Sequence, residues 1–128
     1  MKCLVVGSRN FNDYELMKEN LDSILSTYED ICIVSGGAKG ADSLAERYAK
    51  EKGYKLKVFP ADWDKYGKSA GYIRNEEMHR YISQFEERKC VAFWDGESKG
   101  TAHSFNLCKQ YDNPLSIVRF DIEAEREK

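Results

Sequence analysis

ICIVSGGAKGAD, residues 31–42, opens as an apolar run of strand length and closes on three glycines. An apolar pattern of helical period begins at Ala41, so the stretch predicts a strand, a tight turn and a helix start. Glycine lacks a Cβ, and the backbone at Gly36, Gly37 and Gly40 can therefore take positive φ and approach a bound group. Amides at a helix start attract anions. We interpret the stretch as a phosphate-binding loop; the alternative is a plain turn that needs glycine for its geometry.

The alternation of strand and helix continues on both sides of this stretch. Apolar runs predict further strands at residues 3–6, 55–59, 90–94 and 115–120, with four helices between the strands. Short turns between such elements indicate a parallel sheet covered on both faces. The predicted fold class is α/β, a three-layer Rossmann-like doubly wound parallel sheet of about five strands in the order 3-2-1-4-5. Residues 1–120 would form a single domain, followed by a charged C-terminal tail at residues 121–128.

The predicted topology brings three turns together. Ligands of doubly wound sheets bind beyond the carboxyl ends of the strands, where the strand order reverses. The turns at Gly7, Gly36 and Gly96 would therefore surround one crevice. Residues 61–71 form the longest stretch without a period, and we expect an irregular loop of the kind that often carries function. The third helix would begin at or near Arg74.

Composition limits the function classes. The chain has 128 residues and a formal net charge of −2 at pH 7, which suits one domain and makes nucleic-acid binding unlikely for want of a basic field. The four cysteines have no metal-ligand spacing and are interpreted as reduced and buried in a cytoplasmic protein. The first apolar run ends at Val6, too short for a signal peptide or a membrane span. Apolar helix faces could support a homodimer.

Arginines and acidic residues near the glycine turns are the first candidate ligand-binding groups. Arg9 and Arg74 sit where their side chains could reach the crevice, and arginine binds phosphate bidentately. Surface arginines in water are the alternative. Lys39 could likewise face solvent, and Asp42 could either serve the ligand or support the loop by accepting backbone amides.

The turn at residues 95–101 offers small and hydroxyl side chains after a central strand. Thr101 could donate to a phosphate or cap the next helix, and Asp95 could accept ribose hydroxyls. Trp94 could be core or a stacking surface. Trp63 and Tyr66 could cover a nucleobase or pin the long loop to the domain.

His79 and His103 have no carboxylate or thiol partner at ligand spacing, so we predict no metal site.

Five ordered motifs resemble the YspA-like (cpYpsA-related) family of the SLOG superfamily. They are GSRNF at residues 7–11, SGGAKGAD at 35–42, FPADW at 59–63, AGYIRNEEM at 70–78 and AFWDGESKGT at 92–101. The resemblance covers about residues 2–120. It implies a Rossmann-like fold and binding of nucleotides or nucleotide-derived ligands such as ADP-ribose. Members often have proline where this chain has Tyr72, which touches loop shape more than chemistry.

A more distant similarity is to the Lonely Guy phosphoribohydrolases, which cleave the N-glycosidic bond of nucleoside monophosphates. Their M-x-x-R-K-x-x-M segment is similar to residues 72–78, which would make Arg74 catalytic. Their P-G-G-x-G-T-x-x-E segment resembles residues 95–104. The glutamate that closes that segment assists departure of the base, and here its position holds Ser104, which cannot stabilise a cationic centre as a carboxylate can.

The leading hypothesis is binding or sensing of a nucleotide-derived ligand of the ADP-ribose, NAD or nucleoside phosphate type. The alternative is a nucleotide N-glycosidase, with DNA binding a third class because the superfamily contains a DNA-processing protein. No cofactor is specified by the sequence. The predicted ligand-binding residues are Gly7, Ser8, Arg9, Ser35, Gly36, Gly37, Lys39, Gly40, Asp42, Arg74, Asn75, Trp94, Asp95, Ser98, Gly100 and Thr101.

Overall fold

The computed structural model describes residues 1–120, so the predicted tail at residues 121–128 lies outside the described residues. The elements follow one another as β1 (Lys2–Gly7), α1 (Tyr14–Leu25), β2 (Cys32–Ser35), α2 (Ala41–Lys52), β3 (Lys55–Val58), α3 (Trp63–Tyr66), a 3-10 turn (Gly67–Ser69), α4 (Ala70–Ile82), β4 (Arg88–Trp94), α5 (Lys99–Tyr111) and β5 (Leu115–Arg119).

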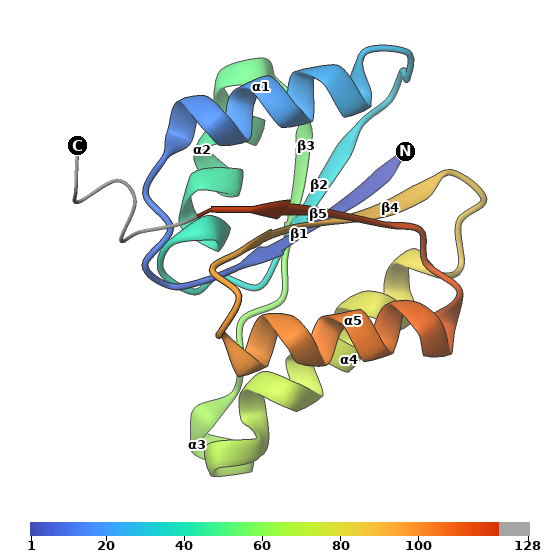
Figure 1. The fold of residues 1–128 in the computed structure, drawn as a ribbon. Helices are drawn as coiled ribbons and strands as arrows, with labels where there is room; N and C mark the ends of the chain where they lie inside the picture. The colour runs from blue at the N-terminus through green and yellow to red at the C-terminus, as the bar shows by residue number, and fades with distance from the viewer. Residues whose placement is uncertain (121–128) are drawn as a thin grey trace.

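The five strands form one parallel sheet in the order β3-β2-β1-β4-β5 (Figure 1). The predicted fold class and strand order are therefore confirmed. β1 lies at the centre, between β2 and β4. From β1 the chain adds β2 and β3 on one side, and it then crosses over to add β4 and β5 on the other side. Within residues 1–120 no helix has the length and apolar character needed to cross a membrane.

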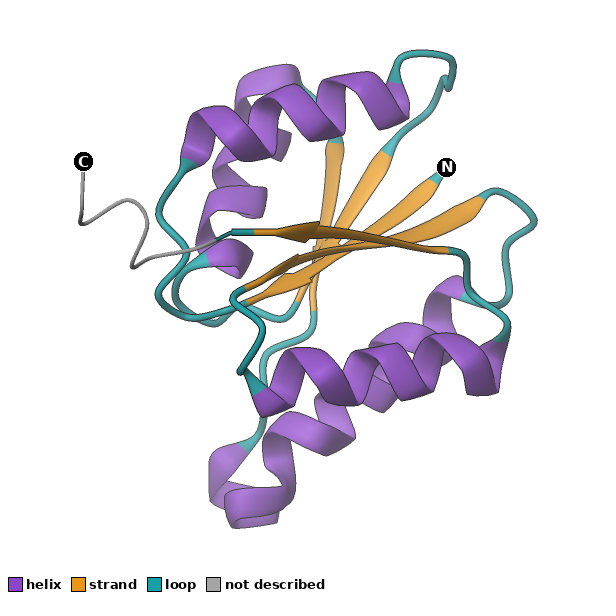
Figure 2. Ribbon diagram, viewed as in Figure 1, coloured by secondary structure: helices purple, strands orange, loops and turns teal. Residues whose placement is uncertain are grey.

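Helices cover both faces of the sheet, with α1 and α2 on one face and α4 and α5 on the other (Figure 2). Successive side chains of a strand point to opposite faces. Cys3 and Val5 of β1 accordingly pack in the cluster with α1 and α2, while Leu4 and Val6 pack in the cluster with α4 and α5. β1 is buried on both sides, which explains its continuous apolar sequence.

Local signals set the ends of the first two helices. Asp13 precedes α1, and its carboxylate accepts a hydrogen bond from the Leu16 amide at 3.1 Å, the N-cap expected of aspartate. Gly53 ends α2 in the left-handed conformation, with φ of 72°. The hydroxyl of Tyr48, on α2, donates to Asp22 of α1 at 2.7 Å and ties these two helices together.

Most of residues 61–71, where we predicted an irregular loop, is helical. α3 and the 3-10 turn occupy residues 63–69, and α4 already begins at Ala70, so Arg74 lies in its second turn. Asp62 caps α3 through a 3.1 Å hydrogen bond from the Lys65 amide. No residue of α3 or the 3-10 turn is buried. Because a helix without a buried face needs no apolar period, the sequence pattern could not detect it.

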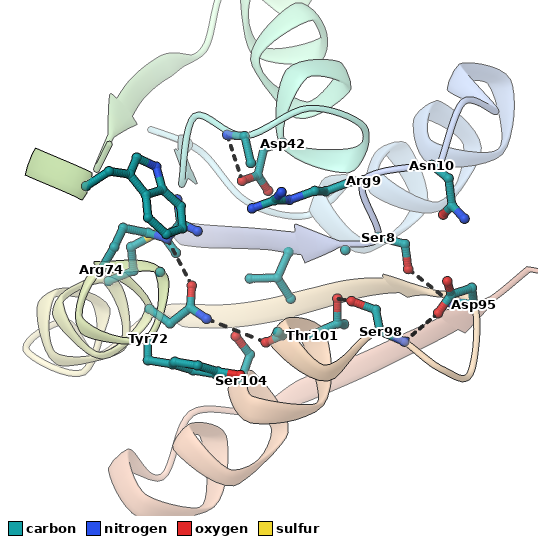
Figure 3. A pocket seen from close by; sticks show the side chains of 18 of the residues that line it. Ser8, Arg9, Asn10, Asp42, Tyr72, Arg74, Asp95, Ser98, Thr101 and Ser104 are labelled. Atoms are coloured by element: carbon teal, nitrogen blue, oxygen red, sulfur yellow. Dashed lines mark hydrogen bonds between the residues drawn. The ribbon is translucent and has the colours of Figure 1, made fainter. Parts of the chain in front are cut away.

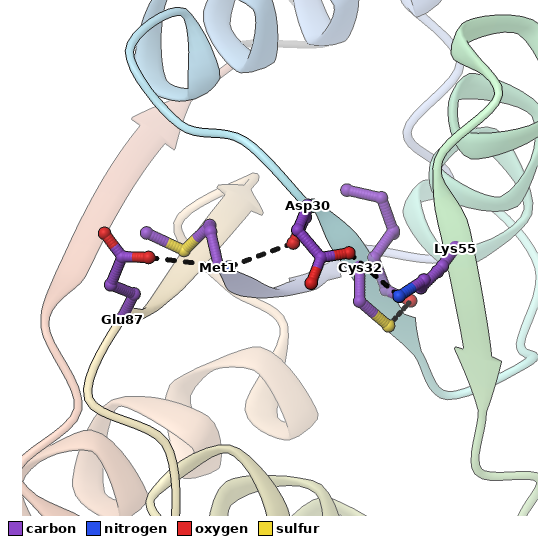
Figure 4. Close-up of polar contacts among 6 residues, drawn as sticks. Met1, Asp30, Cys32, Lys55 and Glu87 are labelled. Atoms are coloured by element: carbon purple, nitrogen blue, oxygen red, sulfur yellow. Dashed lines mark hydrogen bonds and ion pairs between the residues drawn. The ribbon is translucent and has the colours of Figure 1, made fainter.

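The amino-terminal end of the sheet carries polar contacts among Met1, Asp30, Lys55 and Glu87 (Figure 4). The Met1 ammonium donates to the Asp30 carbonyl at 3.1 Å and lies 4.0 Å from the Glu87 carboxylate. Lys55 pairs with Asp30 at 2.8 Å, but both side chains are largely exposed. Exposed pairs of this kind contribute little to stability.

The turns after β1 and β2 touch through their main chains. Gly40 has φ of 77°, and a Cβ there would overlap the carbonyl oxygen of Ser8 and lie 2.5 Å from that of Arg9. A Cβ at Gly7 would lie 2.5 Å from the Cβ of Ala41. Both glycines therefore permit close packing of one turn against the other.

Replacing Gly40 with alanine should destabilise the domain by roughly 2–5 kcal/mol, because positive φ and overlap with a main-chain carbonyl both oppose a Cβ. Urea unfolding measures the change. Gly100→Ala is the control, since a Cβ at Gly100 meets no atom within 4 Å and should leave stability unchanged or slightly higher. Equal stability of the two variants would contradict the role of Gly40.

Candidate functional site

A cavity of about 520 Å³ lies at the carboxyl ends of the central strands. Its walls come from the turn after β1, the turn between β2 and α2, the first turns of α4, and the segment from Asp95 to Ser104 (Figure 3). This is the place where the strand order reverses, and such crevices bind ligands in doubly wound folds. Figure 3 shows Arg9 and Asp42 across the cavity from Thr101 and Ser104.

Arg74 is held in place by two neighbours. Its Nε donates to the Asn75 side-chain oxygen at 3.0 Å, and its Nη1 donates to the carbonyl oxygen of Gly36. A Cβ at Gly36 would lie 2.6 Å from that Nη1, so only glycine lets the guanidinium reach the turn. The predicted positive φ is found at Gly37 and Gly40 but not at Gly36. Gly36 is needed for the approach of Arg74.

Asp42 is a buried carboxyl group beside two arginines. Its Oδ2 accepts a hydrogen bond from the Ala38 amide at 3.1 Å, and the residue is 8% exposed. Burial raises the pKa of Asp42 to about 6, although the Ala38 amide, Arg74 and Arg9 act in the opposite direction. Asp42 supports the loop, and its side chain also lines the cavity.

The amides of the glycine turn are partly used within the turn. Gly37 donates its amide to the Ser35 hydroxyl at 3.3 Å, Ala38 donates to Asp42, and Ala41 donates to the Ser8 carbonyl at 3.2 Å. Three amides that a phosphate could have used therefore already have acceptors. Charged side chains around the turn are better placed than its main chain to attract an anion.

Asp95 shapes the turn before α5. Its Oδ1 accepts from the amides of Glu97 and Ser98 at 2.9 and 2.8 Å, and its own amide donates to the Ser8 hydroxyl at 3.3 Å. Partial burial acts to raise the pKa of Asp95, but these amides and the Ser8 hydroxyl outweigh it, and the pKa is lowered. The carboxylate thus stays ionised at the edge of the cavity.

The start of α5 presents hydroxyl groups to the cavity. Ser98 is the N-cap residue, and its hydroxyl lies 3.2 Å from that of Thr101. Thr101 is in the first turn and is not the cap. Ser104 follows one turn later on the same face, is 1% exposed, and its hydroxyl has no hydrogen-bond partner within residues 1–120. A buried hydroxyl without a partner is costly, so Ser104 is a candidate contact for a bound group.

Asn75 connects the two helices that flank the cavity. Its side-chain nitrogen donates to the Gly100 carbonyl at 3.5 Å, while its oxygen accepts from Arg74. The residue is buried and holds the start of α5 against α4.

The structure brings ten of the predicted residues to the main cavity. They are Gly7, Ser8, Arg9, Asp42, Arg74, Asn75, Asp95, Ser98, Gly100 and Thr101. Gly36, Gly37 and Lys39 line an adjoining smaller cavity.

Three predicted residues line neither cavity. Ser35 is fully buried and its hydroxyl donates to Glu46 at 3.0 Å, so it supports the turn. Gly40 packs against the main chain of Ser8 and Arg9 in the turn after β1. Trp94 packs edge-on against Phe105 and donates its indole N–H to the Ser98 carbonyl at 3.2 Å, which makes it a support for the start of α5.

Several residues that line the main cavity were not among the predicted ligand-binding residues. Tyr72 lines it, as does Trp63, which we weighed as a cover for a nucleobase, and both are about half exposed. Asn10, Lys68 and Ser104 also belong to its wall. Tyr66, which we paired with Trp63, does not line it. The spacing Thr101–Ser104 places both hydroxyls on one face of a helix, a signal that could have identified Ser104.

His79 is not isolated, contrary to our prediction. A nitrogen of its ring and the sulfurs of Cys90 and Cys108 lie within 4.8 Å of one another in the core. Burial lowers the pKa of His79 to about 4, so the ring is neutral. The Asn113 amide group lies 3.0 Å from Nδ1, and Arg88 donates to the Asn113 oxygen at 2.8 Å. Asn113 therefore presents its NH₂ to Nδ1, which leaves the ring proton on Nε2.

A metal ion bound through Nε2 would have to displace that proton, while metal-bound histidines normally donate their other N–H to an acceptor. The hydrogen bonds around His79 therefore favour a packed core cluster over a metal site.

The fold and the position of the cavity define an α/β protein of Rossmann-like type with a candidate site at the switch point of the sheet. The model of the YspA, cpYpsA-related SLOG family matches residues 1–66, and the chain belongs to this family. It is 35% identical over 120 residues to the gene 61 protein of Mycobacterium phage D29, covering 89% of this chain and 93% of that protein. The predicted family resemblance is thereby confirmed.

Solved structures of two DNA processing proteins A share the fold. That of Helicobacter pylori, described for its single-stranded DNA binding mode, has a TM-score of 0.69 at 18% identity and covers 95% of this chain. That of Streptococcus pneumoniae has a TM-score of 0.60 at 19% identity and covers 94% of this chain. This chain spans 66% and 51% of the two solved chains, respectively.

Asp42→Asn should gain stability relative to wild type as the pH rises. Asp42 has a pKa of about 6 in the folded chain against an ordinary value of 3.8, so folding favours its protonated form. The contribution of Asp42 to the stability of wild type is fully present below about pH 4 and is lost as the pH rises through 6. The relative gain of the variant between pH 4 and pH 8 should reach roughly 3 kcal/mol, measured by urea unfolding at each pH. A difference independent of pH would contradict the raised pKa.

Proposed function

We propose that the chain binds a nucleotide-derived ligand in the main cavity. The observation that carries the proposal is the buried Ser104 hydroxyl, which has no hydrogen-bond partner in the described part of the chain and lies in a cavity that also holds Arg9 and Arg74. The cavity volume of about 520 Å³ falls in the range of about 300–1,000 Å³ typical of small-molecule sites. Cations and hydroxyl donors suit a phosphate, and the family membership supports this class of ligand.

The first turn of α5 is the proposed phosphate site. Its early amides have no partners within a helix, its positive dipole end favours an anion, and Thr101 adds a hydroxyl. Arg9 makes no hydrogen bond or ion pair with any other residue of the described part, so its guanidinium can pair with the phosphate. Arg74 already donates from Nε and Nη1, which leaves Nη2 for the ligand.

The remaining parts of a nucleotide also have partners in the cavity. Asp95 uses Oδ1 within its own turn, and its other oxygen is proposed to accept a ribose hydroxyl. Trp63 and Tyr72 are 51% and 48% exposed, and such aromatic surfaces can stack on a base. Tyr72 is braced by edge-on contact with the ring of His103, with 4.7 Å between centroids.

The proposed ligands are ADP-ribose, NAD and nucleoside phosphates, and the proposed location is the cytoplasm, where the four free, buried cysteines would remain reduced.

Arg74→Ala should weaken binding of the recognised nucleotide by about 10–100-fold, since a charge-assisted hydrogen bond contributes about 1.5–3 kcal/mol. Titration calorimetry with ADP-ribose, NAD and AMP measures the loss. Arg80→Ala is the matched control, because Arg80 lies on α4 but pairs at the surface with Glu76. No heat from any nucleotide, with tight binding of a single-stranded DNA oligonucleotide at moderate salt, would favour the function described for the Helicobacter pylori protein instead.

A nucleotide N-glycosidase is the second candidate, favoured by the position of Asp42. A carboxyl group with a pKa of about 6 can exchange a proton near neutral pH, and Asp42 lines the same cavity as Arg74. It could take the part that Ser104 cannot perform.

If turnover occurs, chromatography should detect free base released from a nucleoside monophosphate by wild type and by Arg80→Ala. Arg74→Ala and Asp42→Asn should each reduce the rate at least about 100-fold, the usual size of a general acid–base contribution. Release that is indifferent to both residues would exclude their catalytic roles.

A further inference from the structure

A second cavity of about 330 Å³ adjoins the main one on the side of β2. It is lined by the glycine turn from Gly36 to Lys39 and by the segment after β3. Arg9, Trp63 and Arg74 line both cavities, so the two spaces share a wall. A ligand in the main cavity could therefore extend into the second one along these side chains.

The lining of the second cavity is cationic. Arg9, Lys39 and Arg74 line it, and no carboxylate from residues 1–120 does. In the main cavity the same arginines face Asp42 and Asp95. The second cavity is thus the more favourable of the two for a negatively charged group.

Side chains would hold that group. The amides of Gly37 and Ala38 already donate to Ser35 and Asp42, so they are not open to a ligand. Lys39 is exposed and lines only this cavity, and it forms no hydrogen bond or ion pair among the described residues. Its ammonium group is the one cation of the site that acts on the second cavity alone.

We propose that the second cavity is the subsite for a second phosphate group, and that Lys39 makes the site prefer nucleotides with two linked phosphates over monophosphates. This inference rests on the proposed function. The first phosphate lies at the start of α5, the second lies beside Lys39, and Arg9 and Arg74 contact both. A nucleoside monophosphate would fill the main cavity only.

Titration calorimetry with ADP and AMP on wild type, Lys39→Met and Lys50→Met tests the assignment. Methionine keeps most of the length of lysine and removes its charge. Lys50 is an exposed lysine near the other end of α2 and serves as the control. Wild type and Lys50→Met should bind ADP about tenfold more tightly than AMP, the effect of one charge-assisted hydrogen bond. Lys39→Met should lose that preference while its affinity for AMP stays the same.

The outcomes separate the two proposals. Equal affinity of wild type for ADP and AMP, or a Lys39→Met variant that keeps the preference or weakens both ligands alike, would overturn the second subsite and leave the proposed function standing. Absence of binding by either nucleotide would overturn both. Thermal unfolding checks that Lys39→Met, a change at an exposed side chain, leaves the fold intact.

Discussion

Close main-chain contact between Gly40 and the turn after β1 fixes the geometry of the whole site. The Ala41 amide donates to the Ser8 carbonyl, and the Ser8 amide donates to the Phe93 carbonyl at 3.0 Å. These bonds join the turns that follow β1 and β2 to strand β4, without any side chain. Arg9 and Asp42 stand next to this contact, so the backbone sets their separation before any ligand binds.

The close contact between the turns also places the charged groups Asp42 and Arg74 where the turn itself uses part of their hydrogen-bonding capacity. Asp42 satisfies a turn amide from a buried position, and burial raises its pKa. Arg74 uses part of its guanidinium to hold the Gly36 carbonyl. The glycine turn is thus stabilised by its own neighbours. Because its amides are already used, the groups beside it that can attract an anion are the side chains of Arg9, Lys39 and Arg74. The start of α5 keeps its first amides without helical partners, which is why we propose it for the first phosphate.

Prediction from the sequence succeeded where burial imposes a period. The apolar runs of β1 and β4 and the amphipathic helices gave the correct topology, because both faces of a central strand and one face of each helix must be apolar. It failed at α3, which buries no residue. The sequence also could not show that Trp94 packs against Phe105 or that Ser104 lines the cavity, since a residue next to a turn can point to the cavity or to the core and sequence position does not distinguish the two.

The sequence by itself determined the α/β fold, the strand order and the family, because periodicity, glycine positions and ordered motifs are local properties of the chain. It also placed Arg9, Arg74 and Asp95 near one crevice through the rule for parallel sheets. Only the tertiary structure decided which groups remain open to a ligand. Partners such as Asp42 for Ala38 or Phe105 for Trp94 are brought together by folding, and a polar or aromatic group already paired in this way is no longer available for binding.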